Sequence, residues 1–453
     1  MKRLILKGGR AIDPASRVDG PFDLILDDGQ IAGIVAPGGA AGLSDADTLD
    51  CTGCWIMPGL IDPHVHLRDP GFPQKETIAT GLRAAAAGGF VAVAAMANTR
   101  PVNDTPQVMQ YMVATAAAIG GARLIPVSAV TRGLEGRDAV DFDAMAAAGA
   151  GLFSDDGMPI DDSKLLREAY LNISRLGLAI SLHEEDRALS AGRAINDGSV
   201  ARMLGVGGIP TAAEYQRIER DIELARDSSI AVHIAHISTA ESVGIVRRAR
   251  RAGVRVTCEA APHHFILDDS AVLRAGADAK MSPPLRNRED VDALCAALAD
   301  GTIDMIATDH APHDPDSKNQ AILGHDFPRR EPLAPDHAQA FTVAANGVVG
   351  LETALGLTMR LVDRGVISPM RMAELMSSNP AKLLRLDAGG LRVGAPADIT
   401  VIDPNAAWNV APANFHSRSR NTPFAGMELK GKALVTLAGG KIIHDGRPGA
   451  SQS

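Results

Sequence analysis

The sequence predicts an α/β protein, a (β/α)8 barrel with a small β-sandwich domain built from both termini. The first indication is a series of eight short apolar runs in the middle of the chain, which alternate with stretches of helical periodicity. Unbroken apolar strands between amphipathic helices are typical of parallel strands that helices cover. The second indication is that both ends of the chain carry hairpin patterns. We therefore expect a discontinuous domain of residues 1–54 and 388–453 beside a barrel of residues 55–387.

The two terminal segments predict antiparallel hairpins. Residues 22–35 (FDLILDDGQIAGIV) form two apolar runs around an Asp-Gly pair, which is the strongest short hairpin signal. Residues 397–404 and 432–446 repeat the pattern near the other end, with Gly-Gly at the second turn. Because neither end has enough strands for a sheet of its own, we expect the two ends to share one domain.

The central segment predicts the barrel. Eight strands over about 250 residues is the number that a (β/α)8 barrel requires. An open, doubly wound sheet is the alternative, but it would carry a GxGxxG motif after its first strand, and none is there. The predicted barrel strands are 55–66, 90–98, 124–130, 150–156, 178–186, 230–238, 254–264 and 303–311.

Composition and charge exclude several kinds of partner. The 453-residue chain has a formal net charge of −9 and only 3% aromatic residues, which argues against a nucleic acid or an anionic membrane as partner. Four cysteines do not form a disulfide framework, so a reducing compartment is favoured. No signal peptide is recognisable, and the most apolar stretch, residues 84–97, is too short to span a bilayer. We therefore expect a soluble, cytoplasmic protein.

Polar side chains end five of the predicted strands. Catalytic groups of a barrel lie at the carboxyl ends of its strands. His64 and His66 are two residues apart at the end of the first strand, so both point to the same side. Histidine nitrogens and carboxylates without a nearby thiolate suit zinc or another borderline divalent metal. The groups that end the other four strands are Asp155 with Asp156, His183, His236, and Asp309 with His310.

The motifs around these residues resemble a known family. PGLIDPHVHLRDPG (58–71) is similar to the signature of the amidohydrolase superfamily, and its HLRDPG portion resembles dihydroorotases in particular. The resemblance covers nearly the whole chain and implies a barrel with a β-sandwich domain. Further matching segments are ANTRP (97–101), FSDDG (153–157), HISTAES (236–242), PPLR (283–286), ATDHAPH (307–313) and RSRNTPFAGMELKGK (418–432).

The resemblance implies a metal centre of six ligands. In this superfamily a carboxylated lysine at the end of strand 4 commonly bridges two metals, but no lysine lies between Lys75 and Lys164. Asp156 takes the bridging place, as in the longer bacterial dihydroorotases, and Asp155 is expected to be structural. We expect one or two zinc ions per subunit, with two favoured. The implied ligands are His64, His66 and Asp309 for one metal and His183 and His236 for the other, with Asp156 between them.

The implied reaction is the reversible hydrolysis of L-dihydroorotate to N-carbamoyl-L-aspartate in de novo pyrimidine (UMP) biosynthesis. A metal lowers the pKa of bound water from about 15.7 to about 7 and polarises the ring carbonyl. Asp309 is the expected general acid and base, which carries the proton from water to the departing ring nitrogen.

Substrate contacts follow from the same match. Arg68 offers a planar fork of donors to the substrate carboxylate. Each such bond contributes about 1.5–3 kcal/mol. Ser282 departs from the family, which has asparagine before PPLR, and makes this segment more similar to hydantoinases and dihydropyrimidinases. The expected substrate contacts are His66, Arg68, Asn98, Ser282, His313, Asn346 and Gly347.

Three features have no role in this scheme. Residues 314–340 form a longer loop than expected, which is either a mobile lid or a solvated insertion. His233 is expected to be a core histidine, and His263 and His264 stay unassigned. Cys51 and Cys54 lack the second pair that a zinc ribbon needs.

Other functions compete with this one. Hydantoinase, dihydropyrimidinase and allantoinase activities share the fold and metals but act on rings without a carboxylate, and Arg68 and Asn98 favour dihydroorotate. An inactive scaffold of aspartate transcarbamoylase is an alternative of another class, although such a protein would lose the ligands. Association with aspartate transcarbamoylase and self-association into a homo-oligomer are further hypotheses from the resemblance.

Overall fold

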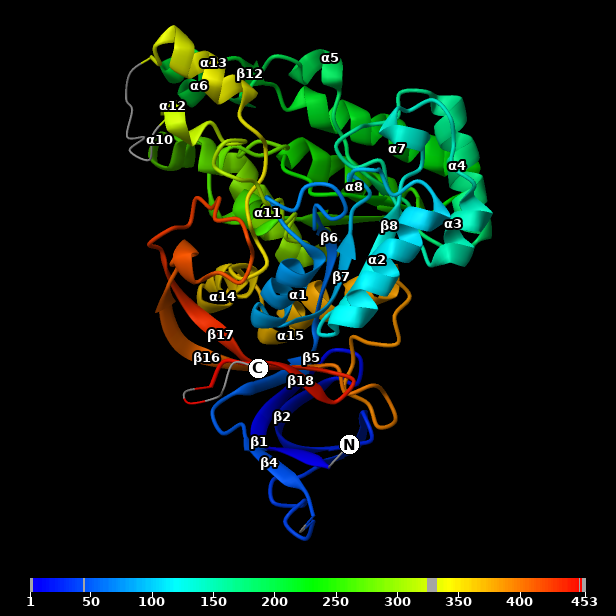
Figure 1. The fold of residues 1–453 in the computed structure, drawn as a ribbon, viewed down its shortest axis with the longest axis vertical. Coiled ribbons are helices and arrows are strands. Elements are labelled where there is room, and N and C mark those ends of the chain that lie inside the picture. Colours follow the sequence, from blue (N-terminus) through cyan, green and yellow to red (C-terminus); the bar gives the residue numbers. More distant parts are fainter. Residues whose placement is uncertain (1–2, 44, 324–331, 448, 450–453) are drawn as a thin grey trace.

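Eight parallel strands in the middle of the chain form the barrel (Figure 1). The computed structural model describes residues 3–43, 45–323, 332–447 and 449. Seven of the eight barrel strands fall within the runs that the sequence predicted, and β8 begins one residue before its run. The strands are β6 (Leu60–Val65), β7 (Phe90–Ala95), β8 (Arg123–Ser128), β9 (Leu152–Phe153), β10 (Ser181–Leu182), β13 (Val232–Ile234), β14 (Val256–Ala260) and β15 (Met305–Ile306).

The barrel is closed by hydrogen bonds. The ladder runs β6-β7-β8-β9 in one half and β10-β13-β14-β15 in the other. A parallel bridge between Phe153 and Ile180 joins the halves on one side, and a bridge between Val65 and His310 joins them on the other. The N–H of His66 also donates to the carbonyl of His310 at 2.8 Å. The predicted fold class is therefore confirmed.

Amphipathic helices cover the barrel. In α4, the side chain of Asp162 caps the first turn by accepting two backbone N–H groups, and Leu166, Ala169, Tyr170 and Ile173 form the buried stripe. The large helices around the barrel are α1 (Ile78–Ala87), α2 (Pro106–Ile119), α3 (Phe142–Ala148), α4 (Ser163–Arg175), α7 (Ala212–Ser228), α8 (Ala240–Arg251), α11 (Arg288–Asp300) and α14 (Ala354–Asp363).

Short elements fill the connections. The loop predicted over residues 314–340 contains α12 and the start of α13, and its residues 324–331 lie outside the described residues, so its role as a lid stays a prediction. The short elements are α5 (Arg187–Ser190), α6 (Ser199–Leu204), α9 (Pro262–Ile266), α10 (Val272–Ala275), α12 (Gln320–Leu323), α13 (Pro335–Val343), α15 (Pro369–Ala373), α16 (Asn379–Leu383), β11 (Ile195–Asn196) and β12 (Gly208–Ile209). Single turns are η1 (Arg132–Leu134), η2 (Asp269–Ala271), η3 (Gly276–Ala279), η4 (Glu374–Ser378) and η5 (Pro412–Asn414).

Both ends of the chain contribute to one eight-stranded sheet, in the order β18-β17-β16-β5-β1-β2-β3 with β4 paired to β1. Figure 1 shows the blue N-terminal strands beside the orange and red C-terminal ones. The predicted turn at Asp28 and Gly29 is present, and both residues have positive φ. Residues from the N-terminal and the C-terminal segments of the chain pack into one hydrophobic core. The domain boundaries themselves stay a prediction. The strands are β1 (Leu4–Asp13), β2 (Val18–Asp27), β3 (Gln30–Val35), β4 (Asp47–Asp50), β5 (Trp55–Pro58), β16 (Ile399–Asn409), β17 (Glu428–Ala438) and β18 (Lys441–Asp445).

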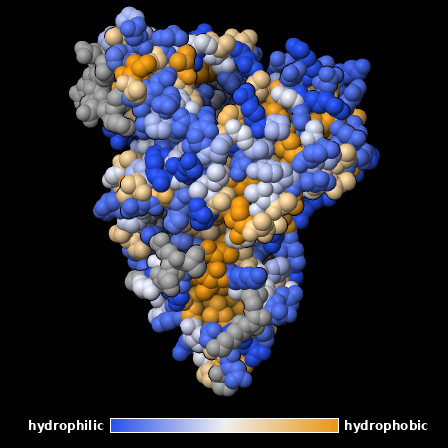
Figure 2. All heavy atoms as spheres, viewed as in Figure 1, coloured by the Kyte–Doolittle hydropathy of each residue, from blue (hydrophilic) through white to orange (hydrophobic). Residues whose placement is uncertain are grey.

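The face of the molecule in Figure 2 is largely hydrophilic. A band of apolar residues lies over its lower, narrower part, where the eight-stranded sheet of the two terminal segments lies. Within the described ranges, none of the helices combines the length and the apolar character that a bilayer span requires.

Asp13 tests whether the two ends of the chain form one cooperative unit. Its buried carboxylate accepts the N–H of Leu391, at 2.9 Å, and the N–H groups of Ala15 and Ser16. We expect Asp13→Ala to lower the free energy of unfolding by about 2 kcal/mol, because these donors lose their acceptor. The control Asp19→Ala removes an exposed carboxylate paired with Arg10 and should cost less than about 1 kcal/mol. Equal thermal unfolding midpoints for the two variants would contradict this role.

Candidate metal centre

Six buried side chains converge at the carboxyl ends of five barrel strands. His64 lies in β6 and His66 just beyond it, and the other groups follow β9, β10, β13 and β15. The structure thus brings together the residues that were predicted as ligands, although they come from five different parts of the chain. They are His64, His66, Asp156, His183, His236 and Asp309.

The carboxylate of Asp156 lies between four imidazole rings. Its Oδ1 is 3.3 Å from His64 Nε2 and 3.5 Å from both His183 Nδ1 and His236 Nε2. Its Oδ2 is 3.5 Å from His66 Nε2. Oδ2 of the carboxylate therefore faces His66, and Oδ1 is shared by His64, His183 and His236.

These side chains fit a divalent metal. Within the described residues, two groups of ligand atoms lie within 4.8 Å of one another, and Asp156 belongs to both. The buried atoms His64 Nε2 and Asp156 Oδ1 face each other without a hydrogen bond to any described group. Two such atoms are satisfied by a cation between them, and imidazole with carboxylate is a donor set that zinc accepts. Asp309 Oδ1 lies 3.0 Å from His66 Nε2 and 3.7 Å from His64 Nε2.

Second hydrogen bonds fix the tautomers of three of the histidines. Carboxylate and amide oxygens only accept, so the ring nitrogen that faces each of them must carry the proton. The opposite nitrogen of each ring then keeps its lone pair and faces Asp156, as metal ligation requires. The three bonds are His64 Nδ1 to Glu259 Oε1 at 2.9 Å, His66 Nδ1 to Asn98 Oδ1 at 2.9 Å, and His183 Nε2 to Glu185 Oε2 at 3.2 Å.

The sequence analysis missed Glu259 and Glu185. Glu259 is buried at the end of β14 and also accepts the Nε2 proton of His233 at 3.0 Å. Burial raises the pKa of Glu259, but the bonds from His233 and His64 outweigh it and lower the pKa to about 2. An acidic residue inside the apolar run VRVTCEAA is the signal that could have identified Glu259. His233 is buried, as predicted for a core histidine, and holds Glu259 in place.

Opposite charges compensate one another within the cluster. Burial raises the pKa of Asp156, yet the facing histidines hold it well below its usual value. Burial likewise lowers the pKa of His64, but Asp156 and Glu259 raise it well above its usual value. The pKa of Asp309 is also lowered, because the effect of burial, which raises it, is outweighed by the hydrogen bond to His66 and by the nearby histidines. The two aspartates are therefore held as carboxylates, by protons on these histidines or, when the rings keep their lone pairs for ligation, by a cation that takes the place of those protons.

The predicted substrate contacts line one hollow beside the ligands. This hollow has a volume of about 250 Å³. Its wall includes Glu185, Gly157 and Ala311 as well, which the sequence analysis did not single out. The predicted residues on the wall are His66, Arg68, Asn98, Asp156, His183, His236, Ser282, Asp309, His313, Asn346 and Gly347.

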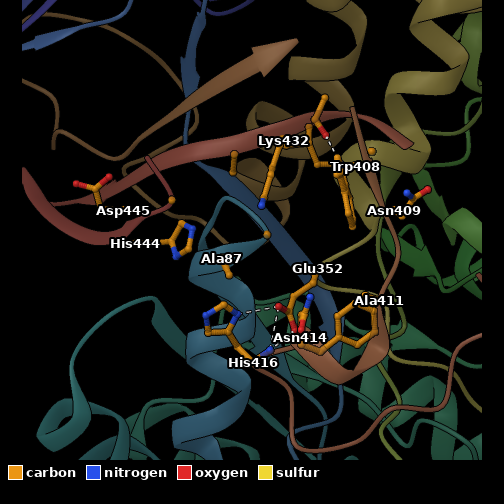
Figure 3. A pocket seen from close by; sticks show the side chains of 17 residues that line it. Ala87, Glu352, Trp408, Asn409, Ala411, Asn414, His416, Lys432, His444 and Asp445 are labelled. Atoms are coloured by element: carbon orange, nitrogen blue, oxygen red, sulfur yellow. Dashed lines mark hydrogen bonds and ion pairs between the residues drawn. The ribbon is translucent and has the colours of Figure 1, made fainter. Parts of the chain in front are cut away.

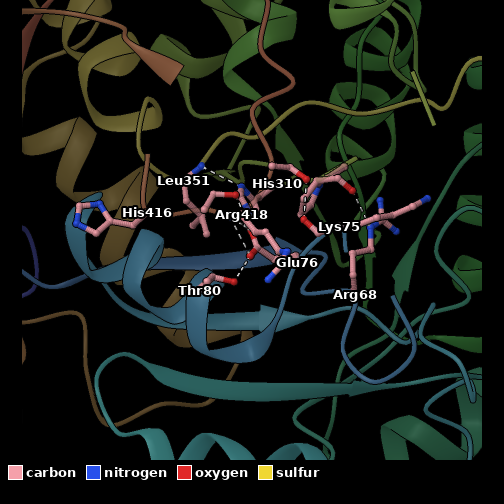
Figure 4. Close-up of polar contacts among 12 residues, drawn as sticks. Arg68, Lys75, Glu76, Thr80, His310, Leu351, His416 and Arg418 are labelled. Atoms are coloured by element: carbon pink, nitrogen blue, oxygen red, sulfur yellow. Dashed lines mark hydrogen bonds and ion pairs between the residues drawn. The ribbon is translucent and has the colours of Figure 1, made fainter. Parts of the chain in front are cut away.

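Two cations flank His313 on this wall. Arg68 Nη2 lies 3.2 Å from His313 Nε2, and Lys75 Nζ lies 3.3 Å from its Nδ1 (Figure 4). Burial and these two charges lower the pKa of His313, so its ring is neutral. Burial lowers the pKa of Arg68 to about 10, which leaves it charged at neutral pH. This side of the hollow is therefore suited to an anionic group.

Glu76 links the barrel to the C-terminal segment (Figure 4). Its buried carboxylate accepts from the Ser417 hydroxyl and, at 3.1 and 3.2 Å, from the Arg418 N–H. It also lies 3.4 Å from Nε2 of His310, the residue after the last predicted ligand. His310 Nδ1 in turn accepts the Gly350 N–H at 3.1 Å. Glu76 thus holds the end of strand β15 in a defined orientation, which the sequence analysis did not foresee.

A larger hollow, of about 690 Å³, lies where α1 and α14 meet β16, β17 and β18 (Figure 3). None of the predicted site residues lines it. His416 is engaged by Glu352 at 2.9 Å. Among the described residues, no group of three metal-ligating side chains includes His416, His444 or the buried pair Cys51 and Cys54. The chemistry of the molecule is therefore concentrated in the smaller hollow.

Comparisons with known proteins find a matching family model, similar sequences and similar folds. A family model described as "Dihydro-orotase-like" matches residues 53–242. The chain is 44% identical to the dihydroorotase of Syntrophotalea carbinolica and 45% identical to that of Syntrophus aciditrophicus, each over 98% of this chain and 99% of the relative. Among solved structures, L-hydantoinase (dihydropyrimidinase) from Arthrobacter aurescens matches with a TM-score of 0.85 at 24% identity, over 98% of this chain and 96% of that one. This structural likeness shows the shared fold.

Glu259 is expected to tune metal binding through His64. In Glu259→Gln one acceptor oxygen remains for two donor histidines, so His64 loses its fixed tautomer in part of the population. We expect metal affinity to fall about 10–100-fold, as measured by competition with a chromophoric chelator. Glu168→Gln, on the exposed face of α4, is the control and should bind metal as the unmodified protein does. An unchanged affinity in Glu259→Gln would show that His64 does not depend on this bond.

Proposed function

The chain belongs to the dihydroorotase family, and we propose that zinc bound at Asp156 serves its hydrolysis of a cyclic amide, L-dihydroorotate, to N-carbamoyl-L-aspartate. The role that we propose in the cell is de novo pyrimidine (UMP) biosynthesis. The observation that supports the proposal most directly is that a metal-ligand cluster and an anion-binding wall of Arg68 and His313 face the same hollow. Such a hollow matches a ring that carries both an amide to be cleaved and a carboxylate.

The proposed zinc ligands divide into two sets that share Asp156. When bound, zinc supplies Lewis acidity, which polarises a carbonyl and lowers the pKa of water. Two ions fit the shared position of Asp156 better than one, since Asp156 belongs to both groups of ligand atoms. The proposed sets are His64, His66 and Asp309 for one ion and His183 and His236 for the other.

Asp309 is proposed to move the proton. The neighbouring histidines keep its side chain as a carboxylate, which can accept a proton from water as the water oxygen bonds to the ring carbonyl carbon. Cleavage of the carbon–nitrogen bond then requires a proton on the departing nitrogen, and Asp309 returns the one that it took. The ring carbonyl becomes a carboxylic acid, which releases its remaining proton to solvent to give the new carboxylate, and Asp309 ends in its starting form.

Arg68, Asn98 and His313 are proposed to bind the substrate carboxylate. Asn98 uses its amide oxygen for His66 Nδ1, so its amide N–H groups stay available as donors. Arg68 also donates from Nε to the Pro312 carbonyl at 3.3 Å, which orients the guanidinium. The neutral ring of His313 beside two cations completes a set that rejects rings without a negative charge.

The competing functions are less well supported. The hydantoinase neighbours share the fold at 24% identity, whereas relatives named dihydroorotase are 43–45% identical over nearly the whole chain. Ser282 lines the hollow and is the one wall residue that favours hydantoin-like rings. An inactive scaffold would lack ligands that this chain has. Association with aspartate transcarbamoylase, self-association and a cytoplasmic location stay predictions.

Steady-state hydrolysis by zinc-loaded protein tests the function. We expect L-dihydroorotate to be hydrolysed at about 1–10³ s⁻¹. Chelation should abolish this activity, and added zinc should restore it. Turnover of hydantoin or dihydrouracil but not of L-dihydroorotate would show instead that the Ser282 segment sets the substrate class. Loss of activity on chelation that manganese restores and zinc does not would contradict the choice of metal.

Arg68 tests the carboxylate site. We expect Arg68→Met to raise the KM for L-dihydroorotate about 10–100-fold, because a charge-assisted hydrogen bond contributes about 1.5–3 kcal/mol. Zinc content should not change. Arg83→Met, an exposed position on α1, is the control. An unchanged KM in Arg68→Met would remove Arg68 from the substrate site.

A further inference from the structure

A fully buried lysine lies in the long loop after His313. The side-chain amine of Lys318 is within hydrogen-bond distance of four backbone carbonyl oxygens. Burial lowers the pKa of this amine to about 7, and the amine donates hydrogen bonds in either protonation state. The acceptors are Ala277 at 2.9 Å, Lys280 at 3.2 Å, Ala345 at 2.9 Å and Gly347 at 2.7 Å.

These four carbonyls belong to two segments that meet at the hollow. One segment runs from η3 to Ser282, and the other contains Asn346 and Gly347, which lie on the same wall. The N–H of Gly347 donates to the carbonyl of Lys280 at 2.9 Å, so the segments are also joined directly. A single side-chain amine therefore contacts two parts of the wall at once.

Asn421 holds the same wall from another side. Its Nδ2 donates to the carbonyls of Gly347 and Ala311, each at 3.0 Å. Its Oδ1 accepts the N–H of His313 at 3.0 Å. Asn421 is buried and lies in the C-terminal segment, so this segment contacts the loop that carries His313 and the loop that carries Gly347.

Gly347 is where the two side chains meet. The carbonyl of Gly347 accepts hydrogen bonds from the side chains of Lys318 and Asn421, and its N–H donates to the backbone carbonyl of Lys280. The polar backbone atoms of Gly347 are therefore already bonded within the protein. Its φ is +130°, and a Cβ there would lie 2.5 Å from Ala311 Cβ. The backbone at Gly347 is thus pressed against the loop that follows β15, in a conformation that favours glycine.

We propose that Lys318 and Asn421 are positioning residues for the substrate ring: they clamp the Gly347 carbonyl and thereby fix the Asn346–Gly347 wall and the segment leading to Ser282. The proposal rests on the dihydroorotase function. It assigns a role to the start of the long loop, whose Lys318 is anchored in the interior. Because the N–H and carbonyl of Gly347 are bonded within the protein, the proposal gives Gly347 a steric role at the ring and no hydrogen bond to it.

The test compares two isosteric changes in zinc-loaded enzyme. Asn421→Asp removes the donors to Gly347 and Ala311, and Asn319→Asp removes a donor in the long loop that binds the Ala340 carbonyl, away from the hollow. Orotate, the unsaturated analogue of the substrate ring with the same carboxylate, serves as a probe that binds without being hydrolysed. We expect Asn421→Asp to raise the KM for L-dihydroorotate and the inhibition constant of orotate together, by about ten-fold, with kcat within about three-fold. Asn319→Asp should leave both constants within about two-fold. Zinc content should be the same in all.

Lys318→Met should likewise raise KM while leaving kcat nearly unchanged. If Lys318→Met does not fold, Asn421→Asp alone tests the proposal. Unchanged KM and inhibition constant in folded Asn421→Asp would overturn the proposal. So would a loss of kcat or zinc with KM unchanged, since that pattern belongs to a general structural role. Absence of dihydroorotate turnover in the unmodified protein would be a failure of the function itself, and the clamp would fall with it.

Discussion

A carboxylate removed from water without a cation costs several kcal/mol, and the buried carboxylate of Asp156 faces four histidine nitrogens at 3.3–3.5 Å. Three of those rings donate the proton of their other nitrogen to an outer acceptor, so lone pairs surround Asp156. Lone pairs around a carboxylate repel one another unless a metal lies among them. The outer acceptors, Glu259 among them, keep the rings in the tautomer that can bind a metal. The chemistry proposed for the hollow depends on that tautomer.

The closed barrel and the chain's outer segments supply different parts of the site. The barrel brings the ligands together, since parallel strands deliver His64 and Asp309 to the same end although 245 residues separate them. The opposite wall depends on segments outside the barrel strands. Lys318 reaches it from the long loop, and Asn421 and the partners of Glu76 reach it from the C-terminal segment. The proposed metal side is thus set by strand ends, and the proposed substrate side by buried polar anchors.

The sequence was sufficient for the barrel and for bringing the six ligand positions together, because each ligand ends an apolar run and strand ends converge in this fold. It could not supply the partners of those ligands. Glu259 and His64 are 195 residues apart, and no local pattern links them. Lys318 was hidden for another reason: it lies in a polar stretch, where a lysine is ordinarily solvated, and only the folded loop shows four carbonyls around it. The roles of the ligands and the domain boundaries stay predictions.

Anomalous diffraction at the zinc absorption edge, from crystals of active, zinc-loaded protein, tests the arrangement around Asp156 most directly. We expect two peaks on opposite sides of its carboxylate, one beside His64, His66 and Asp309 and the other beside His183 and His236. An active crystal in which no peak lies within coordination distance of Asp156, or in which Asp156 turns away from a single ion, would contradict the central role of this carboxylate.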